Sequence, residues 1–301
     1  MSTTENETAL LARVKPYLPM TLASVIWGVM VMPSSWALEE LDPVVLLIAR
    51  TALGGLIAAC YSLWRHRTLR PAPGEWFWLI FMGLAGVTGN NLCYFWALNL
   101  TSKTNVVVIY AVSPVVTILL AHLFLGERLS LRRIVGVLLA VGGVMTLLTG
   151  GQLGRVMDIS FNAGDLWELT GVFLAALMAV AAVKVRQTPA GIALTHTMLS
   201  GLTGAVLIGS VLGFHLPAHL SLRGVLSVAY LGVFSSCLAY GCQQISAVTI
   251  GASATMAFAS CVPVIGMLTA WLVAGETVTL LQIGCTVLIL LGLWLNAGEK
   301  S

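Results

Sequence analysis

The chain has 301 residues, of which 58% are apolar and only 9% are charged, and its formal net charge is +3. Soluble domains carry about 25% charged residues, so this chain has too little charge to cover a water-facing surface and is predicted to be an integral membrane protein. A net charge this small gives no reason to expect a nucleic-acid partner.

Apolar runs long enough to span a lipid bilayer recur along the whole chain. A spanning helix needs about 20 mostly apolar residues, and the breaks between the runs carry charges or turn-forming residues. On this basis we predict an all-α integral membrane protein with ten transmembrane helices. The predicted spans are 18–37, 43–64, 75–98, 103–124, 132–149, 165–185, 190–213, 224–246, 250–273 and 280–297.

One segment of the chain occurs twice, at 113–143 and again 149 positions later. Roughly a third of the aligned positions are identical without a gap, which indicates an internal repeat. The matched residues include Pro114 with Pro263, Gly126-Glu127 with Gly275-Glu276, and Gly143 with Gly292. We therefore divide the chain into an N-terminal tail (1–17), a first five-helix repeat (18–149), a linker (150–164), a second five-helix repeat (165–297) and a C-terminal tail (298–301).

The lysines and arginines predict how the repeats face, because cytoplasmic loops carry an excess of them. With both termini inside, the inside segments hold eleven of these residues and the outside loops three, which places the 150–164 linker outside. Five spans per repeat is an odd number, so the second repeat enters the membrane upside down. The linker after the first Gly-Glu pair carries three arginines and the linker after the second carries none. This pattern is typical of inverted-repeat transporters, whose substrate site lies near the bilayer midplane between the halves.

Four motifs together resemble those of the EamA-type branch of the drug/metabolite transporter superfamily. They are SVIWG ending at Gly28, LLIARTALGGL around Arg50, YFWALNLTSKTN from Tyr94, and the repeated block at 113–143. The resemblance covers nearly the whole chain. It implies ten helices with both termini cytoplasmic, a place in the bacterial inner membrane, and export of amino acids or related metabolites. Many relatives carry a lysine late in the first helix where this chain has Pro33, which puts a cationic contact there in doubt.

Matched polar residues lie in the third and eighth spans, related by the shift of 149. They are Asn91 and Tyr94 in one span and Tyr240 and Gln243 in the other, with Asn90 and Gln244 beside them. Each pair is three residues apart and so shares one helix face. Polar side chains within spans usually face a cavity, so we predict that these residues line the substrate path. The alternative is that they only join helices through hydrogen bonds.

Four further residues are predicted to line the same path from other spans. They are Trp27 in the first span, Tyr110 in the fourth, Trp167 at the outer end of the sixth and Ser260 in the ninth. The fourth and ninth spans also hold Pro114 and Pro263. Because proline frees backbone carbonyls and allows a bend, these two are predicted to be gates or hinges; the alternative is a static kink.

Few charged residues lie within the spans. Arg50, about two turns inside the second span, is a candidate to hold a substrate carboxylate bidentately. The alternative is a structural pairing with Glu39, Glu40 or Asp42. Glu168 lies near the outer end of the sixth span and is titratable. No acidic residue is placed at mid-depth, so the sequence indicates no obvious site for a coupling ion.

These features predict a secondary transporter that moves small metabolites by alternating access, as an exporter or facilitator. Amino acids, including aromatic and apolar ones, are the favoured substrates. The alternatives are a carrier of drug-like cations or of sugar- or nucleotide-type metabolites, a channel, and a membrane-embedded enzyme. An enzyme and an ATP-driven pump are disfavoured because the sequence has no HExxH, GxSxG or Walker motif. We expect no cofactor or metal, and a monomer is compatible with this architecture.

Overall fold

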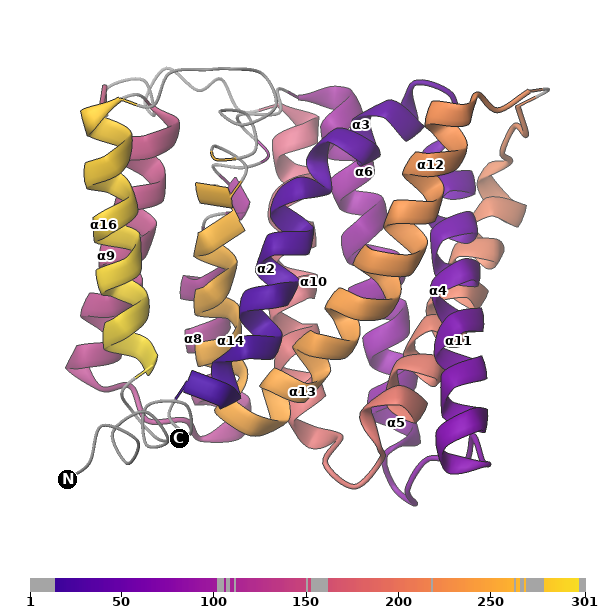
Figure 1. Cartoon of the computed structure of the whole chain (residues 1–301), viewed down its shortest axis with the longest axis horizontal. Coiled ribbons are helices and arrows are strands. Elements are labelled where there is room, and N and C mark those ends of the chain that lie inside the picture. The colour runs from indigo at the N-terminus through magenta and orange to yellow at the C-terminus, as the bar shows by residue number, and fades with distance from the viewer. Residues whose placement is uncertain are drawn as a thin grey trace, which may run out of the picture.

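The computed structural model describes residues 14–101, 106, 109–110, 112–149, 151–152, 162–217, 219–262, 264–265, 268 and 279–297. Within these residues, every regular element is a helix (Figure 1). Five stretches of them are long and apolar enough to cross a membrane: Lys15–Leu38, Pro43–His66, Ala163–Lys184, Ala190–Leu212 and Leu222–Ile250. Ser113–Leu125 and Ile283–Leu295 are shorter apolar helices.

The described elements represent each predicted span and follow the predicted order. The first half contains η1 (Lys15–Tyr17), α2 (Leu18–Val29), α3 (Val31–Leu38), α4 (Pro43–His66), α5 (Trp76–Phe81), η2 (Met82–Asn90), α6 (Asn91–Leu100), α8 (Ser113–Leu125) and α9 (Leu131–Leu148). The second half contains α10 (Ala163–Lys184), α11 (Ala190–Leu212), α12 (Leu222–Tyr230), η4 (Leu231–Ala239), α13 (Tyr240–Ile250), α14 (Ala252–Ala257), η5 (Phe258–Ser260) and α16 (Leu280–Ala297). In the part of the chain that the structure describes, the fold is all-α, and its elements correspond to ten spans arranged as two inverted five-helix repeats.

The two halves agree in local structure as well as in sequence. The segments η2 and η4 are both π-helical, and a shift of 149 residues carries the bounds of one onto the other. The same shift carries α9 onto α16. π-helical turns are rare and are found mostly at functional sites. The nine-residue π-helical stretches at equivalent places therefore distinguish the third helix of each half from the other helices.

The helices α9 and α16 lie side by side at one end of the bundle (Figure 1). Their contact is symmetric: a Cβ built on Gly143 would lie 2.9 Å from the Cγ1 of Ile289, and one built on Gly292 would lie 2.9 Å from the Cβ of Ala140. Each of these contacts becomes the other under the 149-residue shift. Glycine therefore lets the two backbones approach closely, and the late glycine of the repeat is explained by helix packing about the two-fold axis.

The halves interlock through their second and third helices. The segment η2 packs on α11 of the other half, and η4 packs on α4. Close approach is again required, because a Cβ on Gly83 would lie 2.5 Å from the carbonyl oxygen of Thr197, and one on Gly54 would lie 3.0 Å from that of Gly232. The two halves thus share an extensive interface at this end of the bundle.

Two loop carboxylates join the halves at the membrane faces. Glu75 accepts hydrogen bonds from the backbone amides of Arg186, Gln187 and Thr188 just before α11. Burial opposes ionisation of Glu75, but these bonds and the Thr188 hydroxyl outweigh it and lower its pKa. At the opposite face, Glu40 accepts bonds from the hydroxyl and amide of Ser221, and they lower its pKa too.

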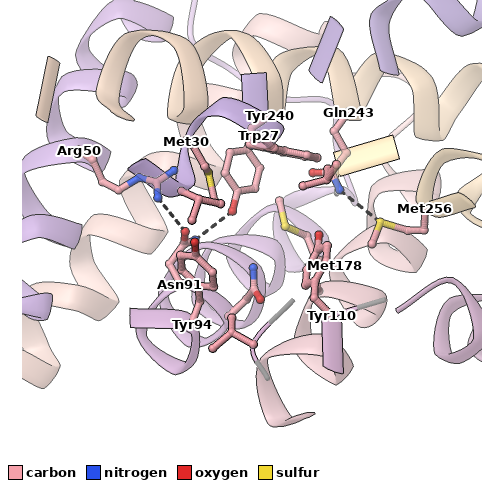
Figure 2. Close-up of a pocket in the computed structure, with 15 residues that line it drawn as sticks. Trp27, Met30, Arg50, Asn91, Tyr94, Tyr110, Met178, Tyr240, Gln243 and Met256 are labelled. Carbon is pink, nitrogen blue, oxygen red and sulfur yellow. Dashed lines mark hydrogen bonds between the residues drawn. The ribbon is translucent and has the colours of Figure 1, made fainter. Parts of the chain in front are cut away.

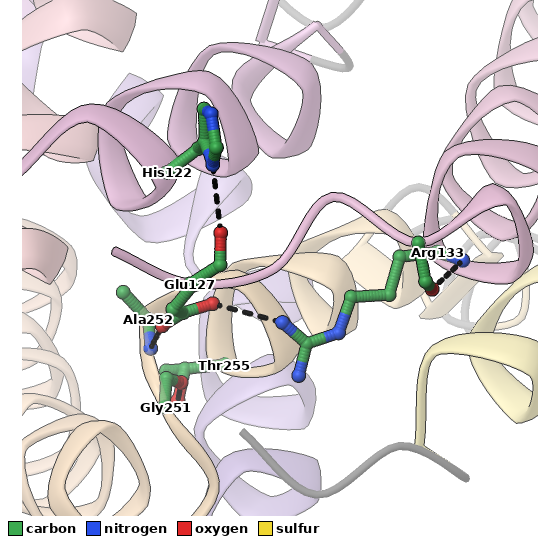
Figure 3. Close-up of polar contacts among 7 residues, drawn as sticks. His122, Glu127, Arg133, Gly251, Ala252 and Thr255 are labelled. Atoms are coloured by element: carbon green, nitrogen blue, oxygen red, sulfur yellow. Dashed lines mark hydrogen bonds and ion pairs between the residues drawn. The ribbon is translucent and has the colours of Figure 1, made fainter. Parts of the chain in front are cut away.

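The Gly-Glu pair of the first half forms a third junction (Figure 3). Gly126 ends α8 in a left-handed conformation with φ 69°, which glycine adopts without strain. Glu127 then accepts a hydrogen bond of 3.1 Å from the amide of Ala252, the first residue of α14 in the other half. Its second oxygen lies 3.2 Å from the guanidinium of Arg133. The motif therefore links the halves at the face that carries the N-terminus.

Candidate substrate cavity

A cavity of about 90 Å³ lies between the two halves (Figure 2). It is lined by Trp27, Met30, Val31, Arg50, Asn90, Asn91, Tyr94, Val106, Tyr110, Ala175, Met178, Tyr240, Gln243, Met256 and Val262. These residues come from both repeats, as a site on the pseudo-two-fold axis requires. Eight residues predicted from the sequence are among them: Trp27, Arg50, Asn90, Asn91, Tyr94, Tyr110, Tyr240 and Gln243.

Two lining residues that are related by the repeat touch each other. The amide of Asn91 donates a hydrogen bond of 2.9 Å to the hydroxyl of Tyr240, one repeat of 149 residues away in the chain. A residue that contacts its own counterpart must lie close to the pseudo-two-fold axis. Asn91 and Tyr240 are the first residues of α6 and α13, directly after the π-helical segments η2 and η4. The junction of π- and α-helix thus places the matched polar residues on the axis.

Arg50 is the cationic residue among the described lining residues, and it is only 1% exposed. Its guanidinium donates hydrogen bonds to the hydroxyls of Ser236 (2.9 Å) and Ser235 (2.8 Å) and to the side-chain oxygen of Asn91 (3.0 Å). These acceptors are neutral. A guanidinium has five N–H donors, so donors remain for a further acceptor in the cavity. Within the part of the chain that the structure describes, no carboxylate lies within ion-pair distance of Arg50.

The structural pairing considered for Arg50 is therefore wrong. Glu39 forms an ion pair with Arg223, Glu40 binds Ser221, and Asp42 caps the start of α4 by accepting from the amide of Val44. Pro43 follows that cap as the first helical residue, a favoured arrangement. These three acids thus start a helix or join loops at the surface, and none of them is the partner of Arg50.

The rest of the wall is aromatic and sulfur-containing. Trp27 meets Tyr240 edge to face, with ring centroids 5.6 Å apart. Met30, Met178 and Met256 complete this part of the lining (Figure 2). Methionine side chains are flexible and polarisable and adapt to different partners. Such a wall suits an apolar or aromatic group on the ligand, while the polar groups around Arg50 and Asn91 fix its orientation.

Three predicted residues do not line this cavity. Trp167 packs against Trp96 with ring centroids 4.8 Å apart. Gln244 is buried and donates to the carbonyl oxygens at the end of α10, 3.1 Å from that of Ala182. Ser260 is buried in η5. Gln244 thus makes the interhelical hydrogen bonds considered above, and its role in the substrate path stays a prediction, as do those of Trp167 and Ser260.

The two predicted hinges have different outcomes. Pro114 is buried in the first turn of α8, where it needs no hydrogen-bond donor. It therefore stands at the start of α8, and the described residues 106, 109 and 110 before it are helical as well. Pro263 lies outside the described residues. The hinge role of both prolines stays a prediction.

Sequence reasoning missed the methionines and the small residues of the wall. Ala175 and Met178 are three residues apart on α10 and share one helix face. Their counterparts one repeat earlier are Ile26 and Val29, so all four residues are apolar and the repeat contains no matched polar signal here. An apolar residue in a spanning helix suits lipid, a packed interior or a cavity wall equally well. No sequence signal could therefore have identified these residues.

Comparisons with known proteins agree with this architecture. The model of the EamA-like transporter family matches residues 15–149 and again residues 162–298. An uncharacterized transporter of Bacillus subtilis, YyaM, is 29% identical over 73% of this chain and 72% of its own length. A WAT1-related protein of Arabidopsis thaliana is 24% identical over 96% of this chain and 84% of its own.

A solved crystal structure shares the fold. Its TM-score is 0.75 at 19% identity, and the match covers 93% of this chain and 96% of the other. At that identity the likeness concerns the fold alone. The two family matches, one for each half and together spanning most of the sequence, also agree with the division into repeats. The chain belongs to the EamA-like transporter family and is a multi-pass membrane transporter.

Proposed function

We propose that this protein is a secondary transporter of small zwitterionic metabolites, with amino acids that carry apolar or aromatic side chains as its substrates. It works by alternating access in the bacterial inner membrane, as an exporter or facilitator, with both termini in the cytoplasm. It needs no ATP and carries out no chemical reaction on its substrate. The observation that carries this proposal is Arg50, a buried cation that faces the cavity and, among the described residues, binds neutral acceptors.

The charge of Arg50 favours one class of solute over the others. A buried cation without a counter-charge is costly, and a substrate carboxylate would offset that cost through charge-assisted hydrogen bonds. A drug-like cation would instead meet a like charge. Sugar phosphates and nucleotides call for several cationic groups, and the described lining offers Arg50 alone. Trp27 and the methionines supply the surface for an apolar side chain.

Counterflow in proteoliposomes tests the proposal. Vesicles holding purified protein and one unlabelled amino acid should take up the labelled form, and a screen of the twenty amino acids identifies the substrates. The double variant Tyr94→Ala/Tyr240→Ala should abolish this exchange, because it removes two aromatic lining residues and the hydrogen-bond partner of Asn91. Tyr61→Ala is the matched control, since Tyr61 is 49% exposed on the outside of the bundle and should exchange normally.

Substrate class is tested separately with Arg50→Gln. Losing hydrogen bonds to a charged group costs about 1.5–3 kcal/mol, so exchange of amino acids should fall about tenfold or more at low substrate concentration. Amines that lack the carboxylate should not lose transport in this variant. Undiminished amino-acid exchange by Arg50→Gln, or by the double tyrosine variant, would refute the assignment of the cavity.

A channel is distinguished from a carrier by the same vesicles. Counterflow requires that the site be exposed to one side at a time, whereas a channel lets the label equilibrate without accumulation. Cross-linking the two halves should stop exchange if the halves must move. Flux that continues in the cross-linked protein would favour the channel.

A further inference from the structure

The interior holds a buried ionisable group that the cavity description does not use. Glu168 of α10 is 1% exposed, and one of its carboxyl oxygens, Oε2, has no hydrogen-bond partner among the described residues. No cation of the described part of the chain lies within ion-pair distance of it. Its counterpart in the first half is Pro19, so the repeat does not require a carboxyl group at this place.

Position along α10 connects Glu168 with the cavity. Glu168 and Ala175 are seven residues apart, which places them on the same face of the helix two turns apart. Ala175 lines the cavity. Between them on this face, Gly171 packs against Asn90 and Cys93, so that a Cβ there would lie 3.1 Å from Cys93 and 3.4 Å from Asn90. The carboxyl group thus lies just beyond the cavity, along one of its walls.

Glu168 also lies at nearly the depth of Arg50. Both α4 and α10 begin at the face opposite to the N-terminus, because they are even-numbered spans. At 1.5 Å per residue, Arg50 lies about 10 Å and Glu168 about 8 Å along its helix from the first residue. Both interact electrostatically with Tyr94, which lines the cavity. A basic and an acidic group, each without a charged partner among the described residues, therefore both interact with the same tyrosine.

Among the described residues around Glu168 there is no cation, and the carboxylate near it on α10, Asp165, caps that helix and accepts hydrogen bonds from the hydroxyl of Thr101 and the amide of Asn162. The titratable groups that interact with it are Cys93 and Tyr94 of α6 and Tyr110. Of the other elements packed on α10, the segments α5, η2 and α14 contain no ionisable side chain, α8 contains His122 near its far end, and α13 contains Tyr240 and Cys242. An ionised carboxylate in such a place costs several kcal/mol, so the group is expected to hold a proton in this arrangement.

We propose that Glu168 is a proton-binding site of the transport cycle, which holds a proton in the arrangement seen here and releases it when substrate binds. The proposal rests on the proposed function for the class of substrate. A zwitterion brings a carboxylate to Arg50 and an ammonium group to the same depth of the cavity. Movement of α10 away from α6 would admit water and this ammonium charge to Glu168, and both favour the ionised carboxylate. Substrate and proton then cross the membrane in opposite directions.

Calorimetry on the purified protein tests this directly. The twenty amino acids are the probes, and binding is measured at one neutral pH in two buffers that differ in ionisation enthalpy. The difference in heat gives the number of protons released. The expected result is one proton per bound amino acid for the unmodified protein, because one carboxyl group holds one proton. Glu168→Gln, which stays neutral, should bind the amino acid with no release, and Glu168→Asp should restore it.

Each outcome separates this inference from the proposed function. If the unmodified protein binds no amino acid, the proposed function fails. If it binds without releasing a proton, or if Glu168→Gln releases as much as the unmodified protein, the assignment of Glu168 is overturned. Glu39→Gln is the control, since Glu39 is exposed and paired with Arg223 at the surface, and its release should equal that of the unmodified protein. If Glu168→Gln does not fold, Glu168→Asp and Glu168→Ala test the same assignment. Proton release should then persist in Glu168→Asp and be absent in Glu168→Ala.

Discussion

The junction at Glu127 gives the sharpest prediction about movement. Its carboxylate joins the linker between α8 and α9, in the first half, to the start of α14, in the second (Figure 3). We expect Glu127→Ala to destabilise the arrangement seen here relative to one in which these segments are apart. The α8–α9 linker and the start of α14 should separate at the face of the membrane that carries the N-terminus.

The size of the effect follows from the contacts that are lost. The hydrogen bond from Ala252 is charge-assisted, and the carboxylate also pairs with Arg133 in a place where both side chains are nearly buried, at 3% and 8% exposure. A hydrogen bond to a charged group contributes about 1.5–3 kcal/mol. At about 1.4 kcal/mol per tenfold change in an equilibrium constant, the ratio of separated to joined molecules should rise about ten- to a hundredfold.

Spin labels measure this ratio. Labels are placed at Arg128→Cys and Thr249→Cys, two exposed positions in different halves beside the junction, in a protein whose six native cysteines are replaced. Glu127→Ala should increase the share of long distances between the labels. Glu75→Gln is the matched control, because Glu75 joins segments of the extensively packed end of the bundle and should leave this distance unchanged. Equal distance distributions with and without Glu127 would show that this residue does not hold the halves together.

Two further predictions concern stability. The hydrogen bonds at Glu75 lower its pKa below the ordinary 4.5. They therefore stabilise the fold above pH 4.5, and this stabilisation is lost as the pH falls through the lowered pKa. The melting temperature should fall more steeply on acidification in the unmodified protein than in Glu75→Gln. Gly292→Ala should destabilise the protein by about 1–3 kcal/mol, because its Cβ would overlap the carbonyl oxygen of Gly136, whereas Gly142→Ala meets open space and should melt normally.

Much of the fold was predictable because lipid imposes strong constraints on sequence. Apolar length, charges in the loops and the repeat of 149 residues predicted the spans, and α16 begins and ends at the predicted residues, 280 and 297. The break at Met30 between α2 and α3 was not predicted, although Pro33 is a signal for it, because proline offers no N–H to the carbonyl four residues earlier. The π-helical segments η2 and η4 contain no proline, and tertiary packing decides such local details.

The repeat predicted the matched residues of the candidate site, whereas Trp27, Arg50 and Tyr110 were predicted from residue type and position alone. Shifting Asn91 by one repeat gives Tyr240, and this equivalence, together with the cost of polar groups in lipid, was enough to select both residues. The sequence repeat shows that two positions are equivalent, but it does not show that their side chains are in contact. Contact requires a place on the two-fold axis, and only the structure locates that axis.

The functional asymmetry of the protein lies where the repeat fails. Arg50 corresponds to Leu199 in the second half, and Glu168 corresponds to Pro19 in the first. Neither charge has a counterpart, so a search for matched residues passes over both. An exact two-fold carrier would offer the same groups to a substrate from either side. Because these two residues lie at similar depth, nearer the face opposite to the N-terminus, the unmatched ionisable groups in and beside the cavity lie closer to one side of the membrane than to the other. In the proposed transport cycle, matched residues such as Asn91 and Tyr240 belong to the frame that moves, and the unmatched residues Arg50 and Glu168 bind the substrate carboxylate and the proton.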